Sequence, residues 1–157
     1  MPDFTLTDQS GRKFDAKQSL NGRVWVANFI FTNCAGPCPR MTSQLRDIRD
    51  SAQERQDLRF VSFTIDPARD TPEVLATYAK HFGADPDRWY YLTGAQSDLH
   101  YLMRNIFMLG NVDGTLEHST RFVLVDAQSR IRGFYDSADP ESLKKLKADL
   151  STLVGSA

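Results

Sequence analysis

The sequence predicts a single α/β domain in which helices flank a central mixed sheet. Almost unbroken apolar runs at 24–31 and 58–65 are typical of strands that are buried on both faces. Each run is followed by a segment whose apolar residues recur at helical spacing. The chain has 157 residues, of which 41% are hydrophobic, and contains no repeat or linker-like tract. We therefore expect one domain that spans residues 1–157.

The first part of the chain predicts a short hairpin, a central strand and a helix. Residues 4–14 alternate in polarity on either side of a turn sequence, which is typical of a β-hairpin. The buried strand at 24–31 follows. We expect a helix from about Cys38 to about Gln56, because Pro39 fits the first turn of a helix but not its interior.

The middle of the chain repeats the strand-helix pattern. After the strand at 58–65, the sequence Asp70-Thr71-Pro72-Glu73 indicates a helix start, with a capping side chain, a proline in the first turn and an acid near the positive end of the helix dipole. Gly83 ends this helix. A short strand at 89–93 and a helix from Ser97 come next. The side chains that we expect the first of these helices to bury are Val74, Leu75, Tyr78, Ala79 and Phe82.

The last part of the chain predicts a hairpin, with strands at 121–125 and 131–135, and a final helix that begins near Asp139. The complete order of elements after the N-terminal hairpin is β-α-β-α-β-α-β-β-α. This is the order of the thioredoxin-like fold, here with an N-terminal β-hairpin extension.

The two cysteines of the chain, Cys34 and Cys38, stand on the turn between the first central strand and its helix. This is the carboxyl end of a central strand, where α/β proteins usually place their chemistry. Thiols four residues apart can reach one metal ion or each other, and helix amides nearby favour the thiolate. The alternative is a pair of buried, inert cysteines. A disulfide scaffold is excluded, because two cysteines are too few for a chain of this length.

A third ligand must be sought among the three histidines. We expect His100 to lie at the edge of its helix in water and His81 to lie in the last turn of its helix. His118 stands just before the strand at 121–125, and in a thioredoxin-like fold that segment lies beside the active-site turn. The alternative is that His118 is an ordinary histidine of a surface loop. Two thiolates and an imidazole match Cu(I), or Cu(II) with an added oxygen ligand. Asp66 is the candidate for that oxygen, although an Asp before a proline also forms turns.

Charge and hydropathy exclude several classes of partner. The formal net charge of −1, from 19 basic and 20 acidic residues, gives no electrostatic case for nucleic acid. No apolar run is long enough to cross a bilayer, and the N-terminus has no signal-peptide pattern. The chain is therefore either soluble and unexported, or it begins after a removed anchor.

These features together closely resemble the Sco/SenC family of copper-binding assembly factors of cytochrome c oxidase. The resemblance rests on Phe31-Thr32-Asn33-Cys34-Ala35-Gly36-Pro37-Cys38-Pro39, on Thr64-Ile65-Asp66-Pro67 followed by Asp70-Thr71-Pro72-Glu73, on Leu92-Thr93-Gly94, and on His118-Ser119-Thr120. It covers nearly the whole chain. Glu117 departs from the family pattern, in which an Asp before the histidine is common, and we expect little effect from this difference.

The resemblance implies that Cys34, Cys38 and His118 bind one copper ion, as Cu(I) or Cu(II), for delivery to the binuclear copper site of oxidase subunit II. The partners it implies are subunit II, a donor copper chaperone and a thiol reductant. It also implies an extracytoplasmic location, on the periplasmic side of the inner membrane or facing the mitochondrial intermembrane space. There the full-length protein would be tethered by an N-terminal anchor that this sequence lacks.

The protein is then expected to be a metallochaperone and not an enzyme. The main alternative is a thiol-disulfide oxidoreductase that keeps the cysteines of a copper-accepting partner reduced. Against it, three residues separate Cys34 from Cys38, where the redox thioredoxins have two. A peroxidase of the peroxiredoxin type is disfavoured, because no proline precedes Thr32 in the strand.

Overall fold

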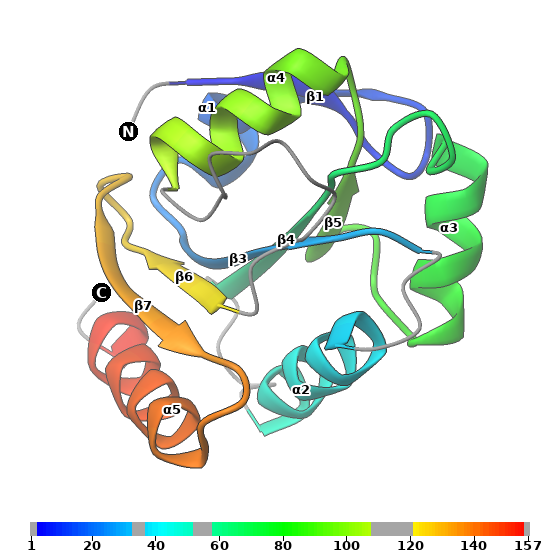
Figure 1. Ribbon diagram of the computed structural model, residues 1–157. Helices are drawn as coiled ribbons and strands as arrows, with labels where there is room; N and C mark the ends of the chain where they lie inside the picture. The colour runs from blue at the N-terminus through cyan, green and yellow to red at the C-terminus, as the bar shows by residue number, and fades with distance from the viewer. Residues whose placement is uncertain (1–2, 33–36, 52–57, 108–120, 156–157) are drawn as a thin grey trace.

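A five-stranded mixed sheet covered by helices on both faces forms the centre of the computed structural model, which describes residues 3–32, 37–51, 58–107 and 121–155 (Figure 1). The strands, in spatial order, are β5 (Trp89–Leu92), β4 (Leu58–Thr64), β3 (Val24–Ile30), β6 (Arg121–Val125) and β7 (Ile131–Asp136). The first three are parallel, while β6 pairs antiparallel with both β3 and β7. This confirms the thioredoxin-like arrangement that the sequence predicts.

The N-terminal extension is a two-stranded hairpin, as predicted, made of β1 (Thr5–Thr7) and β2 (Lys13–Asp15). Gly11 in its turn has a φ of 78°, a conformation that glycine adopts without steric cost. The hairpin joins the rest of the molecule through paired backbone hydrogen bonds between Thr7 and Thr93, 2.9 and 2.8 Å long.

Helices lie on both faces of the sheet (Figure 1). Their bounds are α1 (Ala16–Leu20), α2 (Pro37–Ser51), α3 (Pro72–His81), α4 (Gln96–Tyr101), a π-helical turn η1 (Leu102–Ile106) and α5 (Pro140–Gly155). α2, α3 and α5 cover one face, and α1, α4 and η1 cover the other together with the hairpin. α1 is absent from the sequence prediction, whereas the helix predicted from Ser97 is present as α4 continued by η1. α3 and α5 also agree with the prediction, and the predicted end of the cysteine helix near Gln56 lies outside the described residues.

The core consists of two layers separated by β3, whose seven residues are all buried. Because side chains alternate along a strand, Val24, Val26 and Ile30 join the layer under α2, α3 and α5. Trp25 and Phe29 join the opposite layer. A strand buried on both faces needs an almost continuous apolar sequence, and for this reason the run at 24–31 could be predicted to be a strand.

Two helix starts agree closely with the sequence. α2 begins at Pro37, one residue before the predicted start, so that Pro39 still lies in the first turn, where its missing N–H is not needed. α3 begins at Pro72, and the hydroxyl of Thr71 caps it by accepting a hydrogen bond from Val74 N at 3.3 Å. Gly83, with a φ of 67°, follows its end as predicted.

The prediction that Val74 is buried is wrong. Its side chain is 39% exposed, whereas Leu75, Ala79 and Phe82 are buried and Tyr78 is half-buried. Successive residues of a helix are turned by about 100°, so Val74 lies to one side of the stripe that Leu75 and Ala79 bury.

Candidate metal centre

The structure describes the predicted ligand set only in part. Asp66 is described completely, and Cys38 is described as the second residue of α2, without its side chain. Cys34 and His118 lie outside the described residues. The ligand set Cys34, Cys38 and His118 therefore stays a prediction. In the described part of the chain, no three side chains of His, Cys, Asp or Glu gather as a group that could hold a metal ion.

The described elements that flank the predicted ligands meet at one edge of the sheet. β3 and β4 are parallel, and Ile30 at the end of β3 pairs with Thr64 at the end of β4. β6 runs antiparallel to β3, so it begins at the edge where β3 ends. The segment with Cys34 leaves β3 there, Asp66 follows β4 there, and His118 precedes the first residue of β6 by three positions.

Asp66 serves the turn after β4 and also presents a carboxylate at this edge. Its backbone carbonyl accepts hydrogen bonds from Arg69 N at 3.1 Å and Asp70 N at 2.9 Å. Its carboxylate is largely buried, with Oδ2 3.7 Å from Nε of the exposed Arg69 side chain. The turn-forming role that the sequence left open is thus present in the structure, and the role of Asp66 as an oxygen ligand stays a prediction.

The most highly connected carboxylate at this edge is Asp70, which sequence reasoning placed only in a helix start. Asp70 is completely buried. Its Oδ2 accepts hydrogen bonds from Thr32 N at 3.0 Å and Thr64 Oγ1 at 2.7 Å, and its Oδ1 accepts one from Thr32 Oγ1. Asp70 thereby joins the ends of β3 and β4. The signals in the sequence were that two capping residue types, Asp70 and Thr71, precede one helix, and that both stand in a motif on which the family resemblance rests.

The first two turns of α2 are held against neighbouring elements by polar side chains. Arg40 Nη2 donates to Ser137 Oγ at 3.1 Å, and Gln44 Nε2 donates to the carbonyl of Ser137 at 3.0 Å. Thr42 Oγ1 and Tyr78 Oη of α3 lie 3.0 Å apart in a further hydrogen bond. The helix that carries Cys38 is therefore fixed on two sides.

A series of buried side-chain hydrogen bonds connects β5, β4 and β3 within the sheet. Trp89 Nε1 donates to Ser62 Oγ at 3.1 Å, and Ser62 Oγ donates to Asn28 Oδ1 at 2.6 Å. Tyr91, on the strand beside Ser62, has a completely buried ring, and burial raises the pKa of its hydroxyl well above the ordinary value. Its phenol therefore stays neutral.

The two described histidines differ in their surroundings. His81 is exposed at the end of α3, as predicted, with its ring against Phe82. The expectation that His100 lies in water is wrong, because the residue is half-buried and one ring nitrogen, Nε2, lies 3.4 Å from the carbonyl oxygen of Ile65. α4 lies beside the end of β4, a tertiary contact that helical periodicity does not reveal.

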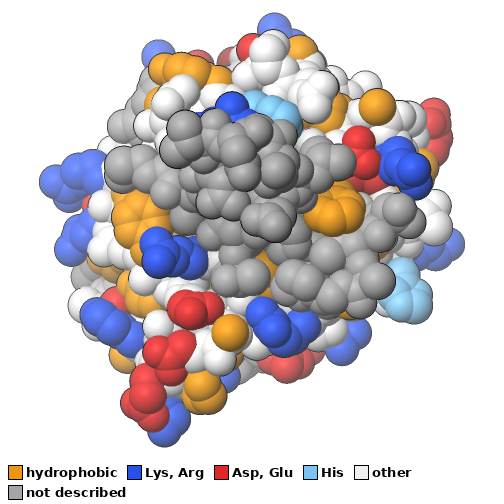
Figure 2. Space-filling model, viewed as in Figure 1, with side chains coloured by type: hydrophobic (Ala, Val, Ile, Leu, Met, Phe, Trp, Pro, Cys, Tyr) orange, Lys and Arg blue, Asp and Glu red, His pale blue; other side chains and the backbone are white. Residues whose placement is uncertain are grey.

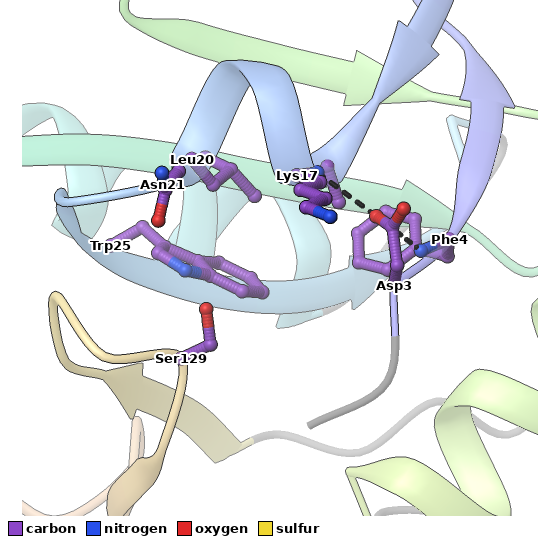
Figure 3. Close-up of a pocket in the computed structure, with 8 residues that line it drawn as sticks. Asp3, Phe4, Lys17, Leu20, Asn21, Trp25 and Ser129 are labelled. Atoms are coloured by element: carbon purple, nitrogen blue, oxygen red, sulfur yellow. Dashed lines mark hydrogen bonds between the residues drawn. The ribbon is translucent and has the colours of Figure 1, made fainter.

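A cavity of about 260 Å³ lies near the opposite end of β3, between the N-terminal segment and the turn joining β6 to β7 (Figure 3). Trp25 and Ser129 line one side, and the other side includes Asp3, whose Oδ1 accepts hydrogen bonds from Phe4 N and Lys17 N, both 2.9 Å long. The cavity is remote from the edge at which β3 ends, so it does not belong to the predicted copper site.

The visible surface carries charges of both signs (Figure 2). Acidic and basic side chains mix over α5, where Lys144 pairs with Glu141 at 3.7 Å and Lys145 with Asp149 at 3.1 Å. Such mixing is unlike the basic stripe of a nucleic-acid-binding face. Across the described ranges, none of the helices has the length and apolar character needed to span a bilayer.

Comparison with known proteins places the whole chain in one family. The model of the family described as SCO1/SenC matches residues 1–155. A solved SCO1/SenC family lipoprotein from Bacillus anthracis is 32% identical, with a TM-score of 0.86 over 98% of this chain and 94% of that one. A Stutzerimonas stutzeri protein described as a candidate copper-binding protein is 32% identical over 85% of this chain and 67% of its own length.

A second solved structure is that of BsSco, described as a member of the Sco family of cytochrome c oxidase assembly proteins in which a disulfide switch was identified. It is 28% identical to this chain, with a TM-score of 0.81 over 98% of this chain and 92% of that one. The family match and these neighbours agree with the fold described above. The chain therefore belongs to the SCO1/SenC family.

Proposed function

We propose that the protein is a copper metallochaperone that binds one copper ion through Cys34, Cys38 and His118 and delivers it to the binuclear copper site of cytochrome c oxidase subunit II. The observation that carries the proposal is the meeting of the described ends of β3, α2 and β6 at one edge of the sheet. The ends of β3 and α2 flank Cys34, α2 carries Cys38 as its second residue, and β6 begins three residues after His118. A chain covers at most about 3.3–3.6 Å per residue, so His118 stays within roughly 11 Å of the start of β6.

The chemistry of this ligand set suits copper as a cargo. Thiolates are soft ligands that favour Cu(I), and an imidazole completes a low-coordinate set. Cys38 occupies the first turn of α2, where the helix dipole and free amides favour a thiolate over a thiol. The relative described as a candidate copper-binding protein supports copper as the metal. Asp66, at the same edge, would supply an oxygen ligand to Cu(II).

Delivery would proceed by ligand exchange. A thiolate of the acceptor would bind the copper ion while Cys34 or Cys38 leaves, so the metal is never free in solution. BsSco, which belongs to a family of oxidase assembly proteins, supports the oxidase as the destination. A donor chaperone would supply the copper, and a thiol reductant would keep both cysteines reduced, because a disulfide cannot bind the metal.

The location we propose is extracytoplasmic, with the full-length protein tethered to the membrane. The support is the Bacillus anthracis relative, which is described as a lipoprotein. Copper-accepting sites of an oxidase subunit on that side of the membrane would then be within reach of the tethered domain.

A second candidate function is thiol-disulfide exchange with the acceptor, favoured by the disulfide switch described for BsSco. A thiolate of Cys34 or Cys38 would attack a disulfide of the partner and form a mixed disulfide. The other cysteine would then resolve it. The partner gains two electrons and two protons as a dithiol, and the Cys34–Cys38 pair becomes a disulfide that a thiol reductant must reduce again.

An anaerobic titration of the reduced protein with Cu(I) and a competing chelator tests the proposal. We expect one equivalent to bind tightly and the His118→Ala variant to bind more weakly and release copper faster. Replacing either cysteine by alanine should abolish tight binding, because one of two soft ligands is lost. His81→Ala is the matched control, since His81 is exposed at the far end of α3 and should leave the affinity unchanged.

The two candidate functions give different results in this experiment. Tight binding that is independent of His118 would refute the three-ligand site. No tight binding by the wild-type protein, together with rapid disulfide exchange, would instead favour the oxidoreductase.

A further inference from the structure

The buried carboxylate of Asp70 connects two strand ends that are distant in the sequence. Thr32, the last described residue before the cysteine turn, donates both its backbone N–H and its hydroxyl to this carboxylate. Thr64, the last residue of β4, donates its hydroxyl to the same group. Thr32 and Asp70 are 38 residues apart in the chain. The contact is therefore a tertiary one, not a local turn.

Asp70 does not act as the cap of α3. That role belongs to Thr71, whose hydroxyl accepts from Val74 N. The carboxylate of Asp70 instead points to the end of β3. No Lys or Arg of the described ranges forms an ion pair with it, and its carboxyl group accepts three hydrogen bonds from Thr32 and Thr64. A buried polar network of this kind favours a rigid connection.

The same network includes Asp66. The hydroxyl of Thr64, which donates to Asp70, accepts a hydrogen bond from Asp66 N at 3.0 Å. The backbone N–H of Asp70 in turn donates to the carbonyl of Asp66 at 2.9 Å. The backbone of Asp66 is thus held from two directions by the residues that also hold Thr32.

We propose that Asp70 is a positioning residue for the copper site: it fixes Thr32, two residues before Cys34, and through Thr64 it fixes Asp66. The proposal rests on the proposed function for its copper readout, but not for the geometry of the cysteine turn. By restraining the start of the turn, Asp70 limits the arrangements that the two thiols can adopt. Residues hydrogen-bonded to metal ligands typically change metal affinity by about 10- to 100-fold when replaced, and we expect an effect of this order for Asp70, which acts through the start of the turn.

The test compares four variants. Asp70→Ala removes all three acceptor contacts, while Thr32→Val removes one hydroxyl donor and keeps the backbone N–H. Asp70→Asn is the conservative variant, since its amide oxygen can accept from Thr32 N and Thr64 and its NH₂ can donate to the Thr32 hydroxyl. Asp126→Ala is the matched control, because Asp126 is a buried carboxylate in the β6–β7 turn, at the other end of the sheet.

Two properties are measured for each variant. We expect the Cu(I) affinity of Asp70→Ala to fall about 10- to 100-fold, that of Thr32→Val to fall less, and Asp70→Asn to recover most of the loss. Asp126→Ala should lose stability but keep its copper affinity. The second property, the rate at which iodoacetamide alkylates the reduced cysteines, needs no copper and should change in Asp70→Ala and Thr32→Val only.

Two results would overturn the proposal. One is wild-type affinity and alkylation rate in both Asp70→Ala and Thr32→Val, and the other is an equal change in Asp126→Ala. If Asp70→Ala does not fold, Thr32→Val decides by the same two measurements. If the wild-type protein binds no copper, the proposed function fails, while the alkylation rates still accept or reject Asp70 as the residue that positions the turn.

Discussion

Replacing Asp126 should destabilise the protein at the end of the sheet opposite the predicted copper site. This carboxylate is 2% exposed and organises the turn between β6 and β7. Its Oδ1 accepts from Gln128 N and Arg130 N, both at 2.9 Å. Its Oδ2 accepts from Arg130 Nε and Arg132 Nη1, both at 3.2 Å. Asp126→Ala removes all four hydrogen bonds at once.

The magnitude follows from the two pairs of contacts. The arginine side chains are 65% and 47% exposed, so water replaces much of their interaction and each pair is worth at most about 1 kcal/mol. Each of the two backbone bonds to the carboxylate contributes about 1 kcal/mol net. The free energy of unfolding should therefore fall by about 2–4 kcal/mol. For a domain of this size, that lowers Tm by roughly 5–15 °C.

Urea unfolding and thermal melting of Asp126→Ala and Asp126→Asn measure this loss. Asp126→Asn keeps the oxygen that accepts the two backbone bonds, so it should lose only about half as much stability as Asp126→Ala. Asp85→Ala is the control, because Asp85 is exposed and its carboxylate accepts a hydrogen bond from Asp87 N at 2.9 Å in another turn. A loss below about 0.5 kcal/mol in Asp126→Ala, the range of ordinary surface substitutions, would refute the reasoning.

Two further predictions concern the core and the response to acid. Leu45→Ala, at a completely buried position of α2, should lower the free energy of unfolding in urea by about 2–5 kcal/mol. Val74→Ala, at an exposed position of α3, should change it by no more than about 0.5 kcal/mol, and equal losses in the two variants would contradict the assignment of buried and exposed faces. Burial alone would raise the pKa of Asp126, but the hydrogen bonds from Arg130 N and Arg132 outweigh it and lower that pKa, and the hydrogen bond from Tyr135 lowers the pKa of Asp149. Because folding lowers the pKa of Asp126, the stability that this carboxylate contributes is fully present above its ordinary pKa of about 4 and is lost as pH falls through the native pKa. Asp126→Asn has no such carboxylate, so this variant should lose less stability than the wild-type protein between about pH 5 and pH 2. An identical acid loss in both proteins, measured by urea unfolding at several pH values, would argue against this linkage.

The sheet was predictable because its strands obey local rules. β3 and β4 are buried almost throughout, and strands of this kind require continuous apolar sequence. The hairpin of β6 and β7 carries the turn residues that such hairpins need. α1 was not predicted, because its five residues are too few to display a helical period. The helix predicted from Ser97 includes η1, but its π-helical geometry was not predicted, since a π-helical turn has no distinct pattern of residues.

For the site, the sequence predicts which residues could bind the metal but not the side-chain contacts that surround them. Cys34, Cys38 and His118 could be selected because their chemistry and their positions relative to predicted strands suggest a metal. The partners of Asp70 could not be found, since Thr32 lies 38 residues away and the neighbouring residues explain Asp70 as part of a helix start. The contact of His100 with Ile65 is likewise set by the packing of α4 on the sheet. Periodicity indicates which face is buried but not which side chains meet.

The most direct test of the central claim is copper K-edge X-ray absorption on the reduced protein loaded with one equivalent of Cu(I). A site made of Cys34, Cys38 and His118 predicts two sulfur neighbours and one nitrogen neighbour around the metal, and His118→Ala should remove the nitrogen neighbour without changing the sulfur count. A spectrum with no sulfur neighbours, or one that is the same in the wild-type protein and in His118→Ala, would contradict the claim.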